Sequence, residues 1–291
     1  METAIIKNVS LKNYNTLKLD ATAAQMAFPH NEDGLCKLID NNTNKKVIII
    51  GRGSNILLSK TFYSEDYLFV NLKFLDNIYK VEDSIYAQSG ATLSSLVWFA
   101  IENNFSGFEF LEDIPGTIGG AIIMNAGTFK DYIGPLVEKV KYYDFSERRI
   151  IEKTPTPNDF SKRTSFWAQK ESIVLSCVLK GGKGNCSQSI EEVARIKQDR
   201  FKKQPRNFPN AGSVFARPKN GPEGVRVWEM IDKVGLRGFK KNGAEFSQKH
   251  PGFIVNTGKA TYNDIIYLIE LAQEKVYKEL GVELVLEWKV I

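Results

Sequence analysis

The sequence contains few of the residues that build disulfide frameworks, metal centres or membrane anchors. Its 291 residues include three cysteines and two histidines. Cys36, Cys177 and Cys186 are too few and too unevenly spaced for a disulfide framework or a zinc site. No apolar run approaches the ~20 residues that span a bilayer, and no basic and apolar leader begins at Met1. The composition therefore predicts a cytoplasmic protein in a reducing compartment, with neither a metal site nor a membrane anchor.

Long blocks of like charge are also missing. The formal net charge is +5, but the 39 basic residues are interspersed with 34 acidic ones. No basic arm for nucleic acid is therefore predicted. The densest basic segment runs from Arg200 to Arg206, and it is equally typical of a solvated helix end and of a site for a small anionic ligand.

The composition and length are those of a globular protein with more than one domain. Hydrophobic residues make up 43% of the chain and charged residues 25%, an ordinary balance for a folded protein. The length suggests two domains, or one double-lobed unit with a smaller third piece, and we place a domain boundary near residue 185. This boundary rests on Gly181 to Asn185, the most linker-like segment.

The hydrophobic periodicity predicts a mixture of strands and helices. Strands are expected over residues 45–50, 138–144, 172–179 and 282–288. Helices are expected over residues 34–42, 91–103, 188–203, 227–234 and 261–280. Thr261 and Asp264 have the spacing of an N-cap with an acidic first turn. Residues 211–218 and 235–251 are predicted to form turns.

A glycine-rich segment, GRGSN at residues 51–55, directly follows the first predicted strand. Its glycines would let backbone N–H groups approach a phosphate, and its serine and asparagine would add side-chain donors. Ile56 stands in place of the third glycine of a dinucleotide fingerprint, and no P-loop lysine follows. Since a glycine turn after a strand is usually only a turn, this segment alone leaves phosphate binding open.

A second glycine-rich segment, IPGTIGGAIIMNAG, covers residues 114–127. We expect no regular element here, because the segment is rich in glycine, yet it is too apolar for a solvated loop. A buried loop needs partners for its N–H and C=O groups, and a ligand rich in acceptors would supply them. Two such segments about sixty residues apart suit a pyrophosphate with an attached ring system.

Several motifs, in the same order, make the sequence resemble the UDP-N-acetylenolpyruvoylglucosamine reductase family from about Asn8 to Val290. Any one of them is open to chance, but together they are specific. They are Asn15-Thr16, GRGSN at 51–55, GFEFLEDIPGTIGGAIIMNAG at 107–127, RTS at 163–165, NAGSVF at 210–215, GAEFSQKHPGFIVN at 243–256, and Glu287.

The resemblance implies an α+β fold. A two-lobed FAD-binding domain of the vanillyl-alcohol-oxidase (PCMH) type would occupy residues 1–60 and 61–184, and an α/β substrate-binding domain would occupy residues 185–291. The chain resembles the short-loop branch of the family, because few residues separate Arg163 from the basic helix. The long-loop branch generally has asparagine at the position of Arg217, so this arginine also agrees with the short-loop branch.

The resemblance also implies which residues hold the ligands. Those expected to bind FAD are Gly51, Arg52, Gly53, Ser54, Asn55, Pro115, Gly116, Thr117, Gly119, Gly120, Asn125, Ala126 and Gly127. Those expected to bind substrate are Lys203, Arg217, Asn256 and Lys162.

The implied reaction is hydride transfer from NADPH to FAD and then to C3 of the enolpyruvyl group of UDP-N-acetylenolpyruvoylglucosamine, which yields UDP-N-acetylmuramate for peptidoglycan. Arg163 would grip the substrate carboxylate, Ser213 would give a proton to C2, and Glu287 would act with Arg163 on the enol. Without the resemblance, these three residues are more simply interpreted as a surface arginine, a turn serine and an exposed strand carboxylate.

Two residues depart from the family pattern. Lys162 stands where the family usually has tyrosine, and Asp113 where it usually has glycine. They motivate an alternative, an FAD-dependent oxidoreductase of the same fold with a different substrate. A non-catalytic nucleotide-binding protein would lack part of the catalytic set, which here is complete. Nothing in the sequence demands more than a monomer.

Overall fold

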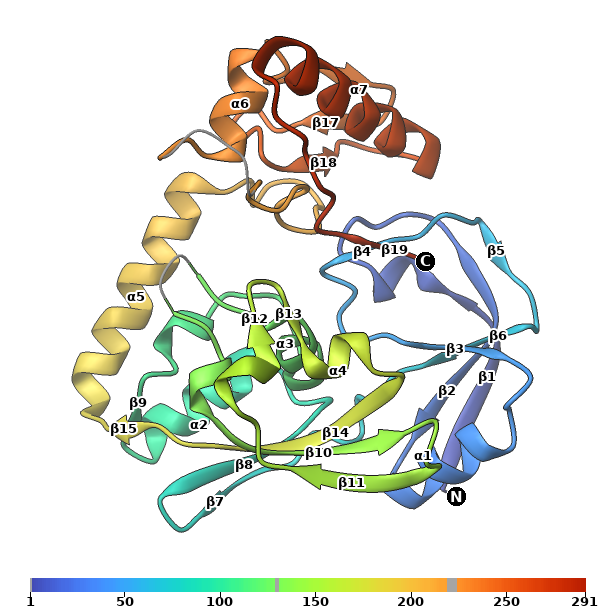
Figure 1. Cartoon of the computed structure of the whole chain (residues 1–291), viewed down its shortest axis with the longest axis vertical. Helices are drawn as coiled ribbons and strands as arrows, with labels where there is room; N and C mark the ends of the chain where they lie inside the picture. The colour runs from blue at the N-terminus through green and yellow to red at the C-terminus, as the bar shows by residue number, and fades with distance from the viewer. Residues whose placement is uncertain (1, 129–130, 219–223) are drawn as a thin grey trace. The chain divides into compact units, whose positions relative to one another are not determined.

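The chain forms two compact units in the computed structural model, which describes residues 2–128, 131–218 and 224–291 (Figure 1). Unit 1 consists of Met1–Asn8, Ala24–Gly51 and Ser64–Asp199. Unit 2 consists of Val9–Ala23, Arg52–Tyr63 and Arg200–Ile291. Both units are discontinuous in sequence, so each gathers segments that are far apart along the chain.

Unit 1 contains most of the strands. They are β1 (Thr3–Ser10), β2 (Thr22–Pro29), β3 (Lys46–Ile49), β6 (Tyr67–Val70), β7 (Ile78–Val81), β8 (Ser84–Gln88), β9 (Phe105–Ser106), β10 (Val137–Asp144), β11 (Arg149–Lys153), β12 (Phe160–Ser161), β13 (Thr164–Ser165), β14 (Ser172–Leu179) and β15 (Gly182–Lys183). Its helices are α1 (Glu32–Asp40), α2 (Leu93–Glu102), α3 (Ile118–Met124), α4 (Phe166–Gln169) and most of α5 (Cys186–Lys203), with short 3-10 helices η2 (Glu109–Leu111), η3 (Gly134–Leu136) and η4 (Pro157–Asp159).

Two sheets organise unit 1. The first has the order β1-β2-β6-β3, with β6 parallel to both β2 and β3. The second is antiparallel and has the order β11-β10-β14-β8-β7, and helices α2, α3 and α4 lie on one side of it (Figure 1).

Side chains from both faces of the second sheet are buried. Tyr142 of β10 packs in one cluster with Trp167 of α4, whereas the next residue, Tyr143, packs in another with Leu35 of α1. Because successive side chains of a strand point to opposite faces, α1 covers the face opposite α4. The second sheet is therefore covered on both faces within unit 1.

Unit 2 is smaller and combines helices with short strands. Its elements are η1 (Leu11–Tyr14), β4 (Ile56–Leu57), β5 (Phe62–Tyr63), α6 (Val227–Lys233), β16 (Lys240–Lys241), β17 (Ala244–Phe246), β18 (Ile254–Asn256), α7 (Tyr262–Leu280) and β19 (Lys289–Val290). Strands β16, β17 and β18 form an antiparallel sheet, and β19 pairs in parallel with β4. Strands and helices thus occur in both units, and the α+β prediction is confirmed.

The prediction of an irregular segment over residues 114–127 was wrong in its middle part. Residues 118–124 form the helix α3. Glycine disfavours helix in isolation, but here Ile118, Ala121 and Ile122 are buried in the core that covers the second sheet. Packing of this apolar face therefore outweighs the low helix propensity of Gly119 and Gly120.

The predicted strand over residues 282–288 was also misplaced, since the structure has β19 at Lys289–Val290. Val282, Leu284 and Trp288 are buried while Glu283 and Val285 are exposed. The alternation therefore reports an extended chain with one buried face. Among the described residues, the backbone of this segment pairs through one isolated bridge and two neighbouring hydrogen bonds, which are too few for a regular ladder.

The turn predicted over residues 235–251 contains strands β16 and β17, with Asn242 and Gly243 as the loop between them. An Asn-Gly pair is a strong local signal for a hairpin. Gly181 to Asn185 contains β15, which pairs with β9. The domain boundaries near residues 60 and 185 stay predictions. None of the described helices combines the length and apolar character that crossing a membrane requires.

The start of α7 agrees with its prediction and provides a test of stability. Thr261 Oγ1 accepts a hydrogen bond from the Asp264 N–H (3.2 Å), and Asp264 Oδ2 accepts one from the Thr261 N–H (2.9 Å). Burial alone would raise the pKa of Asp264, but the hydrogen bonds from Thr261 lower it below its ordinary value.

We expect Thr261→Ala to lower the free energy of unfolding by about 1 kcal/mol, the usual cost of losing an N-cap. Urea unfolding followed by circular dichroism measures this loss. Thr43→Ala is the matched control, because Thr43 is exposed and has no hydrogen bond among the described residues. Equal midpoints for the two variants would contradict a capping role.

Candidate functional site

The first glycine turn follows β3 and meets the second glycine segment within unit 1. A Cβ added at Gly51 would lie 2.6 Å from Thr117 Oγ1, so the backbone of one segment packs against a side chain of the other. Asn71 Nδ2 donates to the carbonyl oxygens of Ile50 (2.8 Å) and Gly51 (3.2 Å). The sequence analysis missed Asn71, although a polar residue directly after the apolar strand β6 is a usable signal.

The rest of the first turn belongs to unit 2. Gly53 has φ 63° and packs so closely on the backbone of Tyr14 that a side chain would overlap with it. Thr16 N–H donates to the Gly53 carbonyl at 3.1 Å. Asn15, 1% exposed, fixes this loop by donating from Nδ2 to the carbonyl oxygens of Leu11 and Leu19. The Asn15-Thr16 motif therefore supports the glycine turn.

The second glycine segment presents backbone donors at the start of α3. The N–H groups of Ile118 and Gly119 donate to the carbonyl oxygens of Ala91 (2.9 Å) and Ser89 (3.0 Å). Within the described part of the chain, the N–H groups of Gly116, Thr117 and Gly120 have no acceptor. Pro115, which has no N–H, is exposed just before them.

The first glycine segment also has unused backbone N–H groups. In the residues that the structure covers, the N–H groups of Gly51, Arg52, Gly53 and Ser54 have no acceptor. Helix N-termini and glycine turns with unused N–H groups bind phosphates and other anions. Both predicted cofactor segments therefore fit a diphosphate-containing cofactor, since they combine unused donors with close backbone approach.

The predicted catalytic arginine lies in unit 1, at the tip of a hairpin beside the second segment. Lys162 and Arg163 form the two-residue turn between β12 and β13, and Arg163 has φ 60°. This left-handed conformation is uncommon for residues other than glycine and asparagine. Arg163 Nη1 donates to the carbonyl of Gly127 at 3.0 Å, while Lys162 is exposed.

The other two predicted catalytic residues lie in unit 2, on neighbouring segments. Ser213 is exposed and follows Gly212, whose φ is 78°. The Glu287 N–H donates to the carbonyl of Val214, the residue after Ser213, at 2.8 Å. Asn55 Nδ2 donates to the Glu287 carbonyl at 3.2 Å. Unit 2 therefore brings the predicted proton donor, the predicted catalytic glutamate and a predicted cofactor residue to one place.

The predicted substrate residues differ in their surroundings. Lys203, the last residue of α5, and Arg217 are both exposed. Asn256 is buried, and its Nδ2 donates to the Leu17 carbonyl at 2.8 Å. Its Oδ1 accepts from the N–H groups of Gly258 (2.9 Å) and Ala260 (3.1 Å). The side chain of Asn256 thus stabilises unit 2, and its substrate contact stays a prediction.

Asp113 keeps the turn that a glycine would favour. Its φ is 68°, so the aspartate adopts the left-handed conformation itself. His250 accepts a hydrogen bond at Nδ1 from the Gly252 N–H at 3.2 Å and packs edge-on against Phe253. Burial lowers the pKa of His250, which favours its neutral form.

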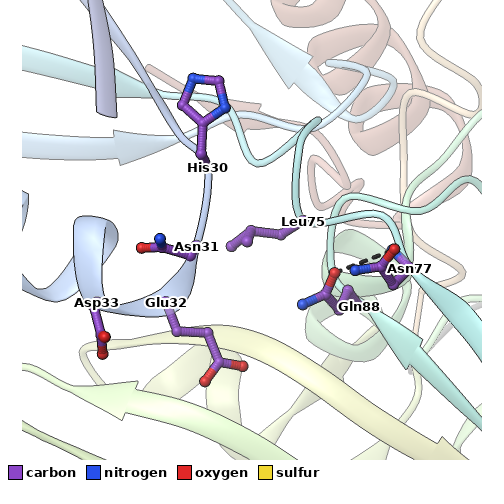
Figure 2. Close-up of a pocket in the computed structure, with 7 residues that line it drawn as sticks. All are labelled: His30, Asn31, Glu32, Asp33, Leu75, Asn77 and Gln88. Atoms are coloured by element: carbon purple, nitrogen blue, oxygen red, sulfur yellow. Dashed lines mark hydrogen bonds between the residues drawn. The ribbon is translucent and has the colours of Figure 1, made fainter. Parts of the chain in front are cut away.

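A shallow depression of about 360 Å³ lies elsewhere on unit 1, and Figure 2 shows its lining. It is bordered by the start of α1 and by residues near β7 and β8, and the Asn77 N–H donates to Gln88 Oε1 at 3.0 Å there. His30 at its rim stacks on Phe74, with 4.5 Å between ring centroids. None of the predicted site residues lines this depression.

Two family models match this chain. Residues 23–146 match the model of an FAD binding domain, and residues 204–291 match that of the UDP-N-acetylenolpyruvoylglucosamine reductase C-terminal domain. A UDP-N-acetylenolpyruvoylglucosamine reductase from Caldanaerobacter subterraneus subsp. tengcongensis is 36% identical over 100% of this chain and 94% of its own. One from Thermosipho melanesiensis is 33% identical over 97% of this chain and 94% of its own.

A solved structure has a similar fold over the whole chain. The crystal structure of UDP-N-acetylenolpyruvylglucosamine reductase from Thermus caldophilus aligns with a TM-score of 0.82 and 27% identity, covering 99% of each chain. The fold and the two glycine loops define an FAD-binding protein with an additional C-terminal α/β part. This chain belongs to the UDP-N-acetylenolpyruvoylglucosamine reductase family. The resemblance and the fold class predicted from the sequence are confirmed.

The contact between the two glycine segments leads to a prediction about cofactor binding. We expect Gly51→Ala to weaken FAD binding about tenfold, equivalent to about 1.4 kcal/mol. The added Cβ would lie 2.6 Å from Thr117 Oγ1 and would push the two segments apart. Fluorescence titration of the deflavinated protein with FAD measures the change.

The double variant Gly51→Ala/Thr117→Ala supplies the control, because Thr117→Ala removes the atom that the new Cβ meets. Relative to Thr117→Ala alone, the double variant should then bind FAD with an affinity that is lowered by much less than tenfold. An unchanged tenfold cost in that background would show that the steric explanation is wrong.

Proposed function

We propose that this protein is an NADPH-dependent flavoenzyme that reduces the enolpyruvyl double bond of UDP-N-acetylenolpyruvoylglucosamine to give UDP-N-acetylmuramate for peptidoglycan. Membership of the reductase family supplies the reaction. The geometric observation that carries the proposal is the 2.8 Å hydrogen bond between the Glu287 N–H and the Val214 carbonyl. It brings the expected glutamate beside the expected proton donor, Ser213.

The FAD diphosphate is expected to bind the unused N–H groups of the two glycine segments. Gly51, Gly53 and Ser54 would donate from the first segment, and Gly116, Thr117 and Gly120 from the second. When bound, FAD supplies the carrier that takes hydride from NADPH and gives it to C3 of the enolpyruvyl group. Within unit 1, the close packing of Gly51 on Thr117 joins the start of the first segment to the second.

Arg163 is expected to bind the substrate carboxylate. Hydride addition at C3 places negative charge on the carboxylate and C2, and a guanidinium can hold a carboxylate through two parallel hydrogen bonds. The hydrogen bond from Nη1 to the Gly127 carbonyl ties the guanidinium to the second glycine segment. Lys162, the neighbouring turn residue, brings a second positive charge.

Ser213 is expected to complete the reaction by giving its hydroxyl proton to C2. Its turn is held by the hydrogen bond from the Val214 N–H to the Gly252 carbonyl at 3.0 Å. Glu287 would stabilise the enol by hydrogen bonding to its oxygen together with Arg163. One hydride at C3 and one proton at C2 then account for the saturation of the double bond.

The remaining parts of the proposal concern the surroundings of the reaction. Lys203 and the basic residues between Arg200 and Arg206 are expected to hold the substrate diphosphate, with Arg217 and Asn256 as further contacts. A cytoplasmic location and a monomeric state complete the proposal, and solution scattering tests the latter.

An anaerobic titration followed by visible absorption tests the function. The purified protein should show a flavin band that bleaches with NADPH and returns with UDP-N-acetylenolpyruvoylglucosamine. Bleaching without return would favour the alternative reductase with a different substrate, which Lys162 and Asp113 motivate. A protein that binds no FAD would refute the function as a whole.

Ser213→Ala separates the two half-reactions. We expect flavin reduction by NADPH to stay within about twofold, and reoxidation by substrate to slow by about 10²- to 10⁴-fold, because only the second step needs the proton. Stopped-flow absorbance measures both rates. Ser187→Ala, an exposed serine on α5, is the matched control. Equal slowing of both half-reactions would remove Ser213 from the role of proton donor.

A further inference from the structure

Asn125 occupies an unusual position at the end of α3. It is the C-cap residue, with φ 42° and ψ 58°, and only 6% of it is exposed. A left-handed C-cap is most often glycine, and asparagine is the usual substitute. A buried amide must find hydrogen-bond partners, because leaving it unsatisfied costs about 1–3 kcal/mol.

Both ends of the Asn125 side chain are hydrogen-bonded within unit 1. Oδ1 accepts from the Gly134 N–H at 3.0 Å, and Nδ2 donates to the Ser161 carbonyl at 3.0 Å. This orientation is the only one that works, because exchanging the oxygen and nitrogen would set donor against donor and acceptor against acceptor. The side chain therefore links three separate segments of the chain.

One of those segments carries the expected catalytic arginine. Ser161 is the last residue of β12, directly before the turn formed by Lys162 and Arg163. The far side of the same hairpin is tied to α3 as well, since Ser165 Oγ donates to the Ile123 carbonyl at 3.1 Å. With the Arg163 to Gly127 hydrogen bond, the hairpin is held at three points along residues 123–127.

The packing around Asn125 leaves little room for movement. A Cβ at Gly134 would lie 3.0 Å from Asn125 Oδ1 and 2.8 Å from Phe160 Cγ. Phe160, the first residue of the hairpin, also packs on Trp167 with 5.6 Å between ring centroids. A change in the amide of Asn125 is therefore transmitted to the hairpin rather than absorbed by free space.

We propose that Asn125 is a positioning residue for Arg163, and that it fixes the turn at residues 162–163 relative to the cofactor segment at residues 125–127. This inference rests on the proposed function, because it gives the Asn125 side chain a task in the substrate half-reaction. It differs from the sequence prediction of a direct cofactor contact. The amide acts on the arginine through the Ser161 carbonyl.

Asn125→Asp tests the link at one atom pair. The new carboxylate keeps an acceptor for the Gly134 N–H but places an oxygen against the Ser161 carbonyl. We expect reoxidation by substrate to slow by about 10- to 100-fold, since a small misplacement of a catalytic group has effects of this size. Reduction by NADPH should slow much less than reoxidation by substrate.

The pH dependence distinguishes positioning from general damage. Below the pKa of the new aspartic acid, its protonated carboxyl can donate to the Ser161 carbonyl as the amide does. The deficit of Asn125→Asp relative to the unmodified protein should therefore shrink as the pH falls. A deficit that is constant across pH, with a lower melting temperature, would indicate a purely structural role and overturn the proposal.

A second variant and a second background complete the test. Asn125→Gly keeps the left-handed backbone without the side chain, so it should show the same selective slowing even if Asn125→Asp folds poorly. In an Arg163→Lys background, Asn125→Asp should slow reoxidation by substrate less than about twofold, because the group that Asn125 positions is already changed. Full additivity, or loss of FAD, would overturn the inference. Failure of the unmodified protein to be reoxidised would instead refute the proposed function.

Discussion

Close approach of backbone segments is the constraint on which the candidate site depends. Gly53 lies against the backbone of Tyr14, and Gly127 lies against the backbone of Asp131, with no room for a side chain at either position. At Gly51 the close neighbour is instead the side chain of Thr117. These contacts let the loops carry unused N–H groups without collapsing, because their shape is fixed by packing and not by hydrogen bonds between the donors. Loops packed in this way can hold side chains in defined positions.

Hydrogen bonds from buried asparagines also hold these segments in place. Asn15, Asn71, Asn125 and Asn256 are all buried, and each donates from Nδ2 to at least one backbone carbonyl of a neighbouring loop. An amide offers both donors and an acceptor. It can therefore satisfy irregular backbone in the way that a ladder satisfies a strand. Each of the four lies beside, or within, a segment that the sequence singled out as part of the site.

Local signals in the sequence were sufficient for most regular elements. The capping pair Thr261 and Asp264 places the start of α7, and the run KKVIII places β3, because both depend on neighbours in the sequence. Helix α3 was missed because its stability comes from an apolar face that packs on a distant sheet. Local propensity does not contain that information. The tail over residues 282–288 showed the correct burial alternation but pairs mainly with the segment after Ser213.

The candidate site was predictable to a different extent. Motif resemblance identifies residue types such as Arg163, Ser213 and Glu287, but not what holds them. The hydrogen bonds of Asn125 and Arg163 join segments that are far apart in the sequence. The Asn55 to Glu287 contact likewise joins residues near opposite ends of the chain. Such pairings depend on the tertiary fold and leave no periodic pattern in the sequence.

The left-handed backbone of Arg163 also restricts how this position can change during evolution. Glycine or asparagine would relax a φ of 60° but would remove the positive charge. Lysine would keep a charge but not the planar, two-pronged grip on a carboxylate. The backbone conformation and the proposed role in carboxylate binding therefore favour different residue types at this position. Compensating mutations are expected to accumulate in the residues that hold the hairpin, since those can stabilise the turn without altering its charge.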